Sequence, residues 1–131
     1  KTEQTRAWFR EALKDWRKMG WDFNHSPFYL DFLEGKRDYD CTPWANPVRS
    51  VLGWQRPCYL FEEGGYAKTY KELLETTPWD KFGRASGHPA CAQCMSHVGF
   101  EPSSVLDAFS SLPRFLAMAR DFSSRGPARA R

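Results

Sequence analysis

Residues 88–100 form the stretch HPACAQCMSHVGF, which places two cysteines, Cys91 and Cys94, two residues apart. Pro89 is suited to the first position of a helical turn, so we expect a turn that runs through this pair to Gly99. Two thiols at this spacing fit a metal site, a redox dithiol or a disulfide. The positions of the other cysteines bear on the choice among these three.

The chain contains two further cysteines, Cys41 and Cys58, in a segment rich in proline and glycine. Packing of free thiols in a core is the plain alternative to a chemical role. A disulfide between Cys91 and Cys94 within one helical turn is geometrically poor, and a thioredoxin-like redox pair lacks its βαβ unit. The pattern therefore favours a four-thiolate metal site. Zinc and an iron–sulfur cluster both stay open, although zinc sites usually have two close cysteine pairs and this chain has one.

Length and composition point to one soluble domain. The 131 residues are too few for two ordinary domains, which predicts a single domain over residues 1–122. Hydrophobic residues make up 41% and aromatic residues 16%, enough for a core. The net charge of +3 comes from interleaved charges, so no field to attract nucleic acid is expected. Residues 123–131 are small, polar and basic, which predicts a disordered tail.

The sequence contains neither a transmembrane run nor the apolar core of a signal peptide, so we expect a cytoplasmic protein. The chain begins with Lys1 inside a helical pattern, which indicates a piece of a longer polypeptide.

Two helices are expected near the start of the chain. Apolar residues three and four apart predict an amphipathic helix over residues 5–19 that ends at Gly20. Ser26 followed by Pro27 predicts the start of a second, mostly buried helix that ends at Gly35.

Later elements follow from proline, glycine and capping signals and give an α+β fold that is mainly α. In chain order, we expect a loop over 36–56, a hairpin that pairs 59–61 with 66–69, a helix from Thr69 to Glu75, a short helical turn over 77–83, a loop over 83–90, and a helix from Glu101 that breaks near Pro113 and ends by Phe122.

Several residues near the cysteines are candidates for a shell around a metal centre. His97 follows Cys94 by three residues and is expected on the same helical face, although a histidine bonded to a backbone carbonyl is the commoner role. Arg56 could face an anionic centre, although a surface salt bridge is the default. His88 is expected in an exposed loop. The candidate shell residues are Gly53, Trp54, Arg56 and His97, with Trp44 close by in sequence.

The segment from Cys41 to Cys58 has the form C-x11-G-x4-C, with Gly53 as its glycine. It resembles the opening motif of the auxiliary-cluster domains called SPASM and twitch, which follow the barrel of many radical S-adenosylmethionine enzymes. Those domains continue with a hairpin, a short helix and a later C-x2-C. The resemblance implies that Cys41, Cys58, Cys91 and Cys94 hold one [4Fe–4S] cluster, as in a twitch domain; the additional cysteines of a full SPASM domain are lacking.

A closer resemblance rests on residues 23–60, 65–83 and 91–106, which contain the stretches RSVLGWQRPCYL, KELLETTPWDKFG and CAQCMSHVGFEPSSVL. These are similar to the C-terminal domain of hopanoid-biosynthesis radical S-adenosylmethionine enzymes, which attach the 5′-deoxyadenosyl group to a hopene and give adenosylhopane. The C-x3-C-x2-C motif and the barrel of that family are not in this sequence. The resemblance implies that S-adenosylmethionine and a second [4Fe–4S] cluster bind to the barrel of the same polypeptide. This chain by itself is therefore not expected to be catalytic, and no Ser/His/Asp or paired-carboxylate set suggests otherwise.

A hopene substrate would make the partner a lipid and is compatible with a peripheral membrane location. The sequence also allows an aromatic wall for such a lipid, although aromatic residues at helical spacing are more often core. The aromatic residues considered for that wall are Trp8, Trp16, Trp21, Phe28 and Tyr29. The alternative function is a zinc-stabilised domain that docks protein partners.

Overall fold

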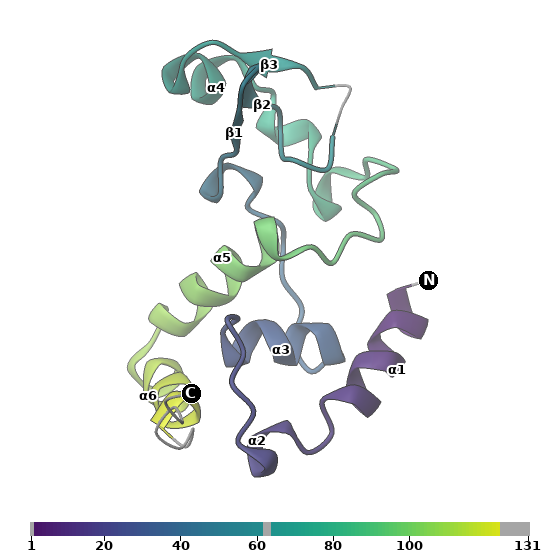
Figure 1. The fold of residues 1–131 in the computed structure, drawn as a ribbon, viewed down its shortest axis with the longest axis vertical. Helices are drawn as coiled ribbons and strands as arrows, with labels where there is room; N and C mark the ends of the chain where they lie inside the picture. Colours follow the sequence, from purple (N-terminus) through teal and green to yellow (C-terminus); the bar gives the residue numbers. More distant parts are fainter. Residues whose placement is uncertain (1, 62–63, 124–131) are drawn as a thin grey trace. The chain divides into compact units, whose positions relative to one another are not determined.

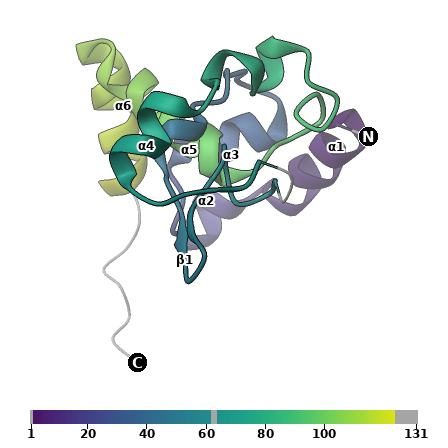
Figure 2. The same cartoon turned by 90° about the horizontal axis from the view of Figure 1, so that it is seen from above.

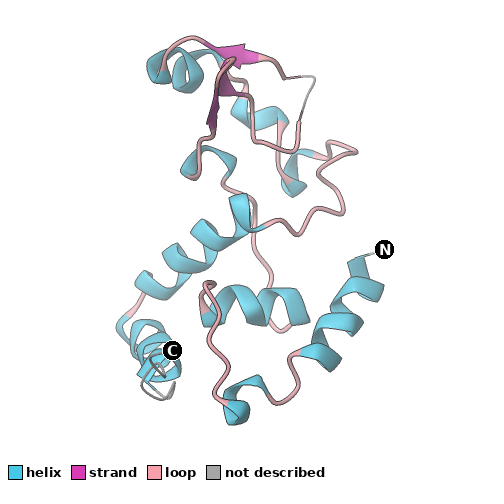
Figure 3. Ribbon diagram, in the orientation of Figure 1, coloured by secondary structure: helices cyan, strands magenta, loops and turns pink. Residues whose placement is uncertain are grey.

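The computed structural model describes residues 2–61 and 64–123 (Figure 1). Helices and loops dominate it, and one small antiparallel sheet completes it, so the expected α+β, mainly α class is confirmed (Figure 3). Contacts divide the chain into two compact units, here called unit 1 (residues within Lys1–Tyr39 and Ser103–Arg131) and unit 2 (Asp40–Pro102). The expected domain end at residue 122 stays a prediction. The expected tail falls outside the described residues, apart from Ser123, which ends the last helix.

Each unit has its own set of elements. Unit 1 contains α1 (Thr2–Ala12), α2 (Trp16–Met19), α3 (Pro27–Glu34), the end of α5 (His97–Phe109) and α6 (Leu112–Ser123). Unit 2 contains the 3-10 helix η1 (Pro43–Ala45), β1 (Arg49–Ser50), β2 (Gly53–Gln55), β3 (Tyr66–Ala67), α4 (Tyr70–Thr76), the 3-10 helices η2 (Trp79–Lys81) and η3 (Arg84–Ser86), and the start of α5.

The expected helix over residues 5–19 is two helices, and the prediction of one continuous helix was wrong. A turn between α1 and α2 interrupts it, in which the Trp16 backbone N–H donates to the Leu13 carbonyl at 3.2 Å. Leu13 in this turn and Trp16 at the start of α2 are both buried. Gly20 ends α2 in the left-handed conformation, as expected, because glycine adopts φ +63° without strain.

Helix α3 is confirmed as a buried helix, and α1 packs against it (Figures 1 and 2). The Ser26 hydroxyl accepts a hydrogen bond from the Tyr29 backbone N–H at 3.2 Å and caps the helix. The same hydroxyl lies 2.7 Å from that of Ser104, so both buried groups are satisfied. Phe28 and Phe32 contribute the largest buried side chains of α3 and form the centre of unit 1.

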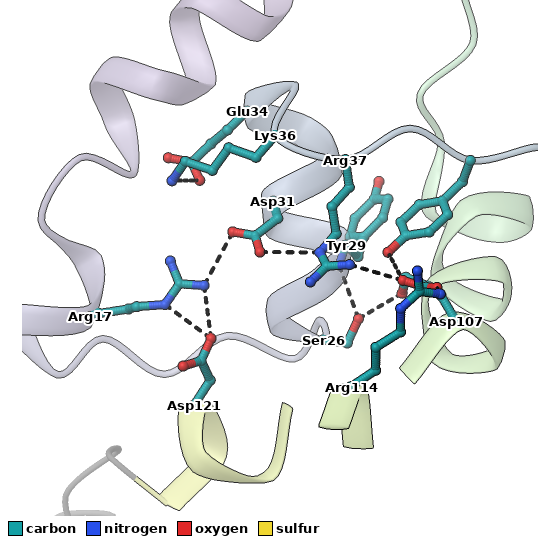
Figure 4. A network of polar contacts seen from close by, with 12 residues as sticks. Arg17, Ser26, Tyr29, Asp31, Glu34, Lys36, Arg37, Asp107, Arg114 and Asp121 are labelled. Atoms are coloured by element: carbon teal, nitrogen blue, oxygen red, sulfur yellow. Dashed lines mark hydrogen bonds and ion pairs between the residues drawn. The ribbon is translucent and has the colours of Figure 1, made fainter. Parts of the chain in front are cut away.

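An ion-pair network joins α3 to α6 (Figure 4). Asp31 of α3 accepts from Arg17 at 3.2 Å and lies within 3.5 Å of Arg37. Arg17 also donates to Asp121 of α6 at 2.9 Å. These groups are only partly exposed, so the network fixes the polar edge of unit 1 more strongly than isolated surface pairs would.

The sheet of unit 2 has the order β1-β2-β3 and is antiparallel throughout. The prediction that residues 59–61 pair with 66–69 was wrong, because Trp54 of β2 pairs with Ala67 instead. The Gln55 side-chain amide donates to the Phe61 backbone carbonyl at 2.7 Å. In a paired strand, that carbonyl would instead accept a hydrogen bond from a backbone N–H of the neighbouring strand. Gly53 permits the close pairing, since a Cβ there would lie 2.6 Å from the Ala67 oxygen. Part of the expected turn, residues 62–63, lies outside the described residues.

Helix α4 is confirmed and packs on the sheet. The Thr69 hydroxyl caps it by accepting from the Glu72 backbone N–H at 3.1 Å. Glu72 in return accepts from the Lys68 backbone N–H at 2.9 Å. The short turn expected over 77–83 is present as η2, and the loop expected over 83–90 contains η3.

The last two helices begin earlier than expected. α5 starts at His97 rather than Glu101, and turns rather than a helix precede it, so Cys94 and His97 do not share a helical face. The break before α6 falls at residues 110–111, near Pro113 as expected, and Pro113 itself lies in the first turn of α6, where its missing N–H costs little. No helix among the described residues is both long and apolar enough to cross a bilayer.

Candidate metal centre

Unit 2 contains a cavity of about 80 Å³ whose wall includes all four cysteines, Cys41, Cys58, Cys91 and Cys94. Cys91 is buried and the other three are half-buried, and all four thiols are free of disulfides. A single water needs only about 10–15 Å³ measured in this way, so the cavity has room for a group of several atoms. The structure thus brings together the four residues that the sequence marks as metal ligands.

Cys41 is held against the start of α5. The next residue, Thr42, donates twice to the Gly99 carbonyl, from its backbone N–H at 3.0 Å and from its hydroxyl at 2.9 Å. A Cβ on Gly99 would lie 2.0 Å from the Cys41 sulfur. Residue 99 therefore has to be glycine for this thiol to occupy its place.

Backbone turns present Cys91 and Cys94 to the cavity. The Cys91 N–H donates to the His88 carbonyl at 2.9 Å, and the Cys94 N–H donates to the Cys91 carbonyl at 3.1 Å. Each sulfur also accepts a backbone N–H, from Gly83 to Cys91 and from Ser96 to Cys94, both at 3.4 Å. Hydrogen bonds from backbone N–H groups to cysteine sulfur are a common feature of the surroundings of metal-bound cysteines.

The pKa values of two of the thiols are raised. Burial, with smaller contributions from the neighbouring thiols at Cys94, Cys58 and Cys91, raises the pKa of Cys41 to about 12. Burial also raises the pKa of Cys58, although the backbone N–H groups of Leu60 and Phe61 oppose this by stabilising the thiolate. The mutual influence of the thiols shows that their charges would interact directly. Four thiolates in this space need a cationic centre, and a bound metal displaces the thiol protons.

The rest of the cavity wall is almost entirely apolar. Its other residues are Pro43, Pro57, Leu60, Phe61, Phe82, Gly83, Arg84, Ala90 and Phe100. Arg84 is the one charged side chain among these described lining residues. A bound group would therefore lie mainly against apolar side chains.

His88 is half-buried, and the expectation of an exposed loop residue was wrong. Its ring lies 5.2 Å from that of Phe61 and 5.4 Å from that of Phe82, both of which line the cavity. Phe61 and Phe82 contact each other edge to face at 5.4 Å. His88 therefore packs against two of the aromatic residues that line the cavity.

The four expected shell residues do not line the cavity. Gly53 and Trp54 belong to β2, and the Trp54 ring packs on Tyr70 at 5.1 Å. Arg56 forms an ion pair with Glu72 at 2.8 Å, the ordinary role considered for it. His97 is exposed, with its ring 6.1 Å from that of Tyr59.

Trp44 packs instead against Trp79 at a ring distance of 6.2 Å. Gly83 and Gly99 lie directly beside cysteine side chains, and Arg84 lines the same cavity. Nothing in the local sequence marks these three residues. Only the folded path of the chain reveals their proximity to the cysteines.

The aromatic residues considered for a lipid-binding wall do not form one surface. Trp16, Phe28 and Tyr29 are buried in the core of unit 1. Trp8 and Trp21 are exposed, Trp8 to 81%. Core packing, the commoner role, accounts for the first three.

Among residues 2–61 and 64–123, no three His, Cys, Asp or Glu side chains gather closely enough to hold a single metal ion. The four thiols instead surround the cavity described above.

Comparison with protein families matches residues 1–118 to the family described as "Domain of unknown function (DUF3463)". No curated protein and no solved structure matches the chain.

Proposed function

We propose that this chain, which belongs to the DUF3463 family, binds one [4Fe–4S] cluster through Cys41, Cys58, Cys91 and Cys94. The observation that carries the proposal is the presence of all four thiols in the wall of one cavity. They come from three separate segments, so local chain connectivity alone does not explain their meeting.

The size and lining of the cavity favour a cluster over a single zinc ion. Zinc draws its thiolates to about 2.3 Å from one centre, which leaves no room between them. Here the four thiols help to line a cavity of about 80 Å³. Apolar walls and N–H donors to cysteine sulfur are the features by which proteins tune iron–sulfur centres.

Four cysteine ligands would occupy all the iron positions of a cubane cluster, so we infer a structural or electron-relay role rather than substrate activation. When bound, the cluster would supply one-electron redox chemistry. The chain itself would contribute the four cysteine ligands, the N–H groups of Gly83 and Ser96, and a mostly apolar wall.

The wider function that we propose is that of the auxiliary-cluster module of a radical S-adenosylmethionine enzyme of hopanoid biosynthesis. The resemblance of the cysteine motifs to twitch domains supports this, as does the resemblance of long stretches to the C-terminal domain of the adenosylhopane-forming enzymes. Transfer of the 5′-deoxyadenosyl group to a hopene would then take place in a barrel with its own cluster and S-adenosylmethionine. A cytoplasmic enzyme, peripheral to the membrane that holds its lipid substrate, is part of this proposal.

Anaerobic reconstitution of the chain with iron and sulfide tests the cluster directly. We expect about four iron and about four sulfide per chain, with an absorption band near the visible range that bleaches on reduction. Replacing Cys91 and Cys94 by alanine should remove most of the iron, whereas Gln93→Ala, an exposed change between them, should retain it. Stoichiometric zinc without iron or sulfide would point instead to the zinc-stabilised docking domain.

A further inference from the structure

Arg84 introduces a positive charge into an otherwise uncharged cavity wall. Among the described residues that line the cavity, the remaining side chains are thiols, aliphatic groups and aromatic rings, apart from the backbone of Gly83. The Arg84 guanidinium carbon lies 5.8 Å from the centre of the Phe100 ring, and Phe100 is fully buried in the same wall. Arg84 is half-buried and is itself one of the residues that line the cavity.

Gly83 sets the position of Arg84. Its φ of +102° lies in the region that favours glycine, and its N–H donates to the Cys91 sulfur at 3.4 Å. A Cβ at residue 83 would lie 3.6 Å from the Cys41 Cβ, so the backbone here passes directly beside two of the thiols. The dipeptide Gly83–Arg84 thus delivers an N–H donor to a sulfur and a cation to the same cavity.

A compensating cation is needed because four thiolates outweigh the charge of a [4Fe–4S] core. Net negative charge in a mostly apolar cavity is costly unless a positive group lies near it. Adding an electron makes the charge more negative, so a nearby cation stabilises the reduced state more than the oxidised state.

We propose that Arg84 is the charge-compensating residue of the cluster and raises its reduction potential. The inference rests on the proposed cluster-binding function and adds to it a residue that is not a ligand. It assigns Arg84 a positioning and electrostatic role, with no covalent step. In the measured reaction an added reductant supplies one electron to the cluster, and no bond forms or breaks.

The test is a potentiometric titration of the reconstituted chain, followed by electron paramagnetic resonance at fixed ionic strength. Arg84→Gln and Arg84→Met remove the charge, and Arg84→Lys keeps it. Arg49→Gln is the control, since Arg49 is an exposed residue of β1 outside the cavity wall. We expect the midpoint potential to move to more negative values in Arg84→Gln and Arg84→Met, and to stay near the wild-type value in Arg84→Lys and Arg49→Gln.

Iron content, measured first, separates the possible outcomes. If Arg84→Gln and Arg84→Met both lose the cluster while Arg84→Lys keeps it, the result supports the inference that the cluster needs a positive charge at residue 84. An unchanged potential in a fully loaded Arg84→Gln chain would overturn the inference and leave cluster binding intact. Loss of the cluster in Arg84→Lys as well would also overturn it, because shape rather than charge would then matter. A wild-type chain that takes up no iron would instead refute the proposed function, and this inference with it.

Discussion

Gly99 leaves the space that the Cys41 sulfur fills, since a Cβ at residue 99 would lie only 2.0 Å from that atom. Two hydrogen bonds from Thr42 to the Gly99 carbonyl hold the segment that contains Cys41 against the start of α5. The position of one thiol in the cavity thus depends on a glycine distant in sequence.

Gly99→Ala should displace Cys41 from the cavity wall. Overpacking of this kind costs about 1–3 kcal/mol, and here the displaced atom is a proposed ligand. We expect the variant to lose most of its iron after reconstitution while circular dichroism still reports the helices.

Gly87→Ala is the matched control for that variant. Its φ of +74° makes an alanine strained, but no atom lies within 4 Å of the added Cβ, so the iron should stay. Full iron in Gly99→Ala would show that the Cys41 sulfur does not need its place beside residue 99.

The metal-free chain should show a depressed reactivity of Cys41. The pKa of Cys41 is raised from 9.0 to about 12, chiefly by burial, so the folded state keeps the thiol proton where the unfolded state has lost it. The contribution of Cys41 to the free energy of unfolding is therefore fully present below about pH 9 and declines as the pH rises toward about 12. Mass spectrometry after timed alkylation should find Cys41 modified much more slowly in the folded chain than in urea. Equal rates in the two states would contradict the burial of this thiol.

Asp107 of α5 gathers three donors in unit 1, which makes it a sensitive position (Figure 4). It accepts from Arg37 at 3.0 Å, from the Tyr39 hydroxyl at 2.9 Å, and from Arg114. Asp107→Asn keeps one acceptor oxygen and removes the charge, which should lower the free energy of unfolding by about 1–3 kcal/mol in urea titrations.

The same variant should lower the pKa of Tyr39. Burial raises that pKa well above its ordinary value of 10.0, and the hydrogen bond to Asp107 adds to the effect. Ultraviolet titration of tyrosine ionisation should detect the change, with Asp22→Asn, at an exposed position, as the control. An unaltered Tyr39 titration in Asp107→Asn would show that the carboxylate has little influence on the phenol.

Local signals in the sequence were sufficient for the capped helices. Ser26, Pro27 and Gly35 mark both ends of α3, and Thr69 with Glu72 marks the start of α4, because capping involves residues only a few positions apart. The spacing of the cysteines, with the resemblance to twitch domains, was likewise enough to single out the four residues that meet at the cavity.

Long-range packing explains what the sequence could not reveal. The pairing of Trp54 with Ala67 depends on the close approach of Gly53 to a distant carbonyl, which no local pattern encodes. Likewise, Gly83 and Gly99 lie beside cysteine side chains, and Arg84 lines the same cavity, only because turns on both sides of η3 and before α5 bring these segments together. The candidate shell residues were predicted because they lie close to the cysteines in sequence. The residues that line the cavity are close to the cysteines in space, and some of them, Arg84 included, lie farther from the cysteines in sequence.

Mössbauer spectroscopy of the chain reconstituted anaerobically with ⁵⁷Fe and sulfide, read together with iron and sulfide content, measures the central claim most directly. A [4Fe–4S] centre held by Cys41, Cys58, Cys91 and Cys94 predicts the signal of a cubane cluster with about four iron per chain, which is lost or changed when any one of the four is replaced by alanine. A signal from mononuclear iron alone, or a cubane signal that is unchanged after replacement of Cys41 or Cys58, would contradict it.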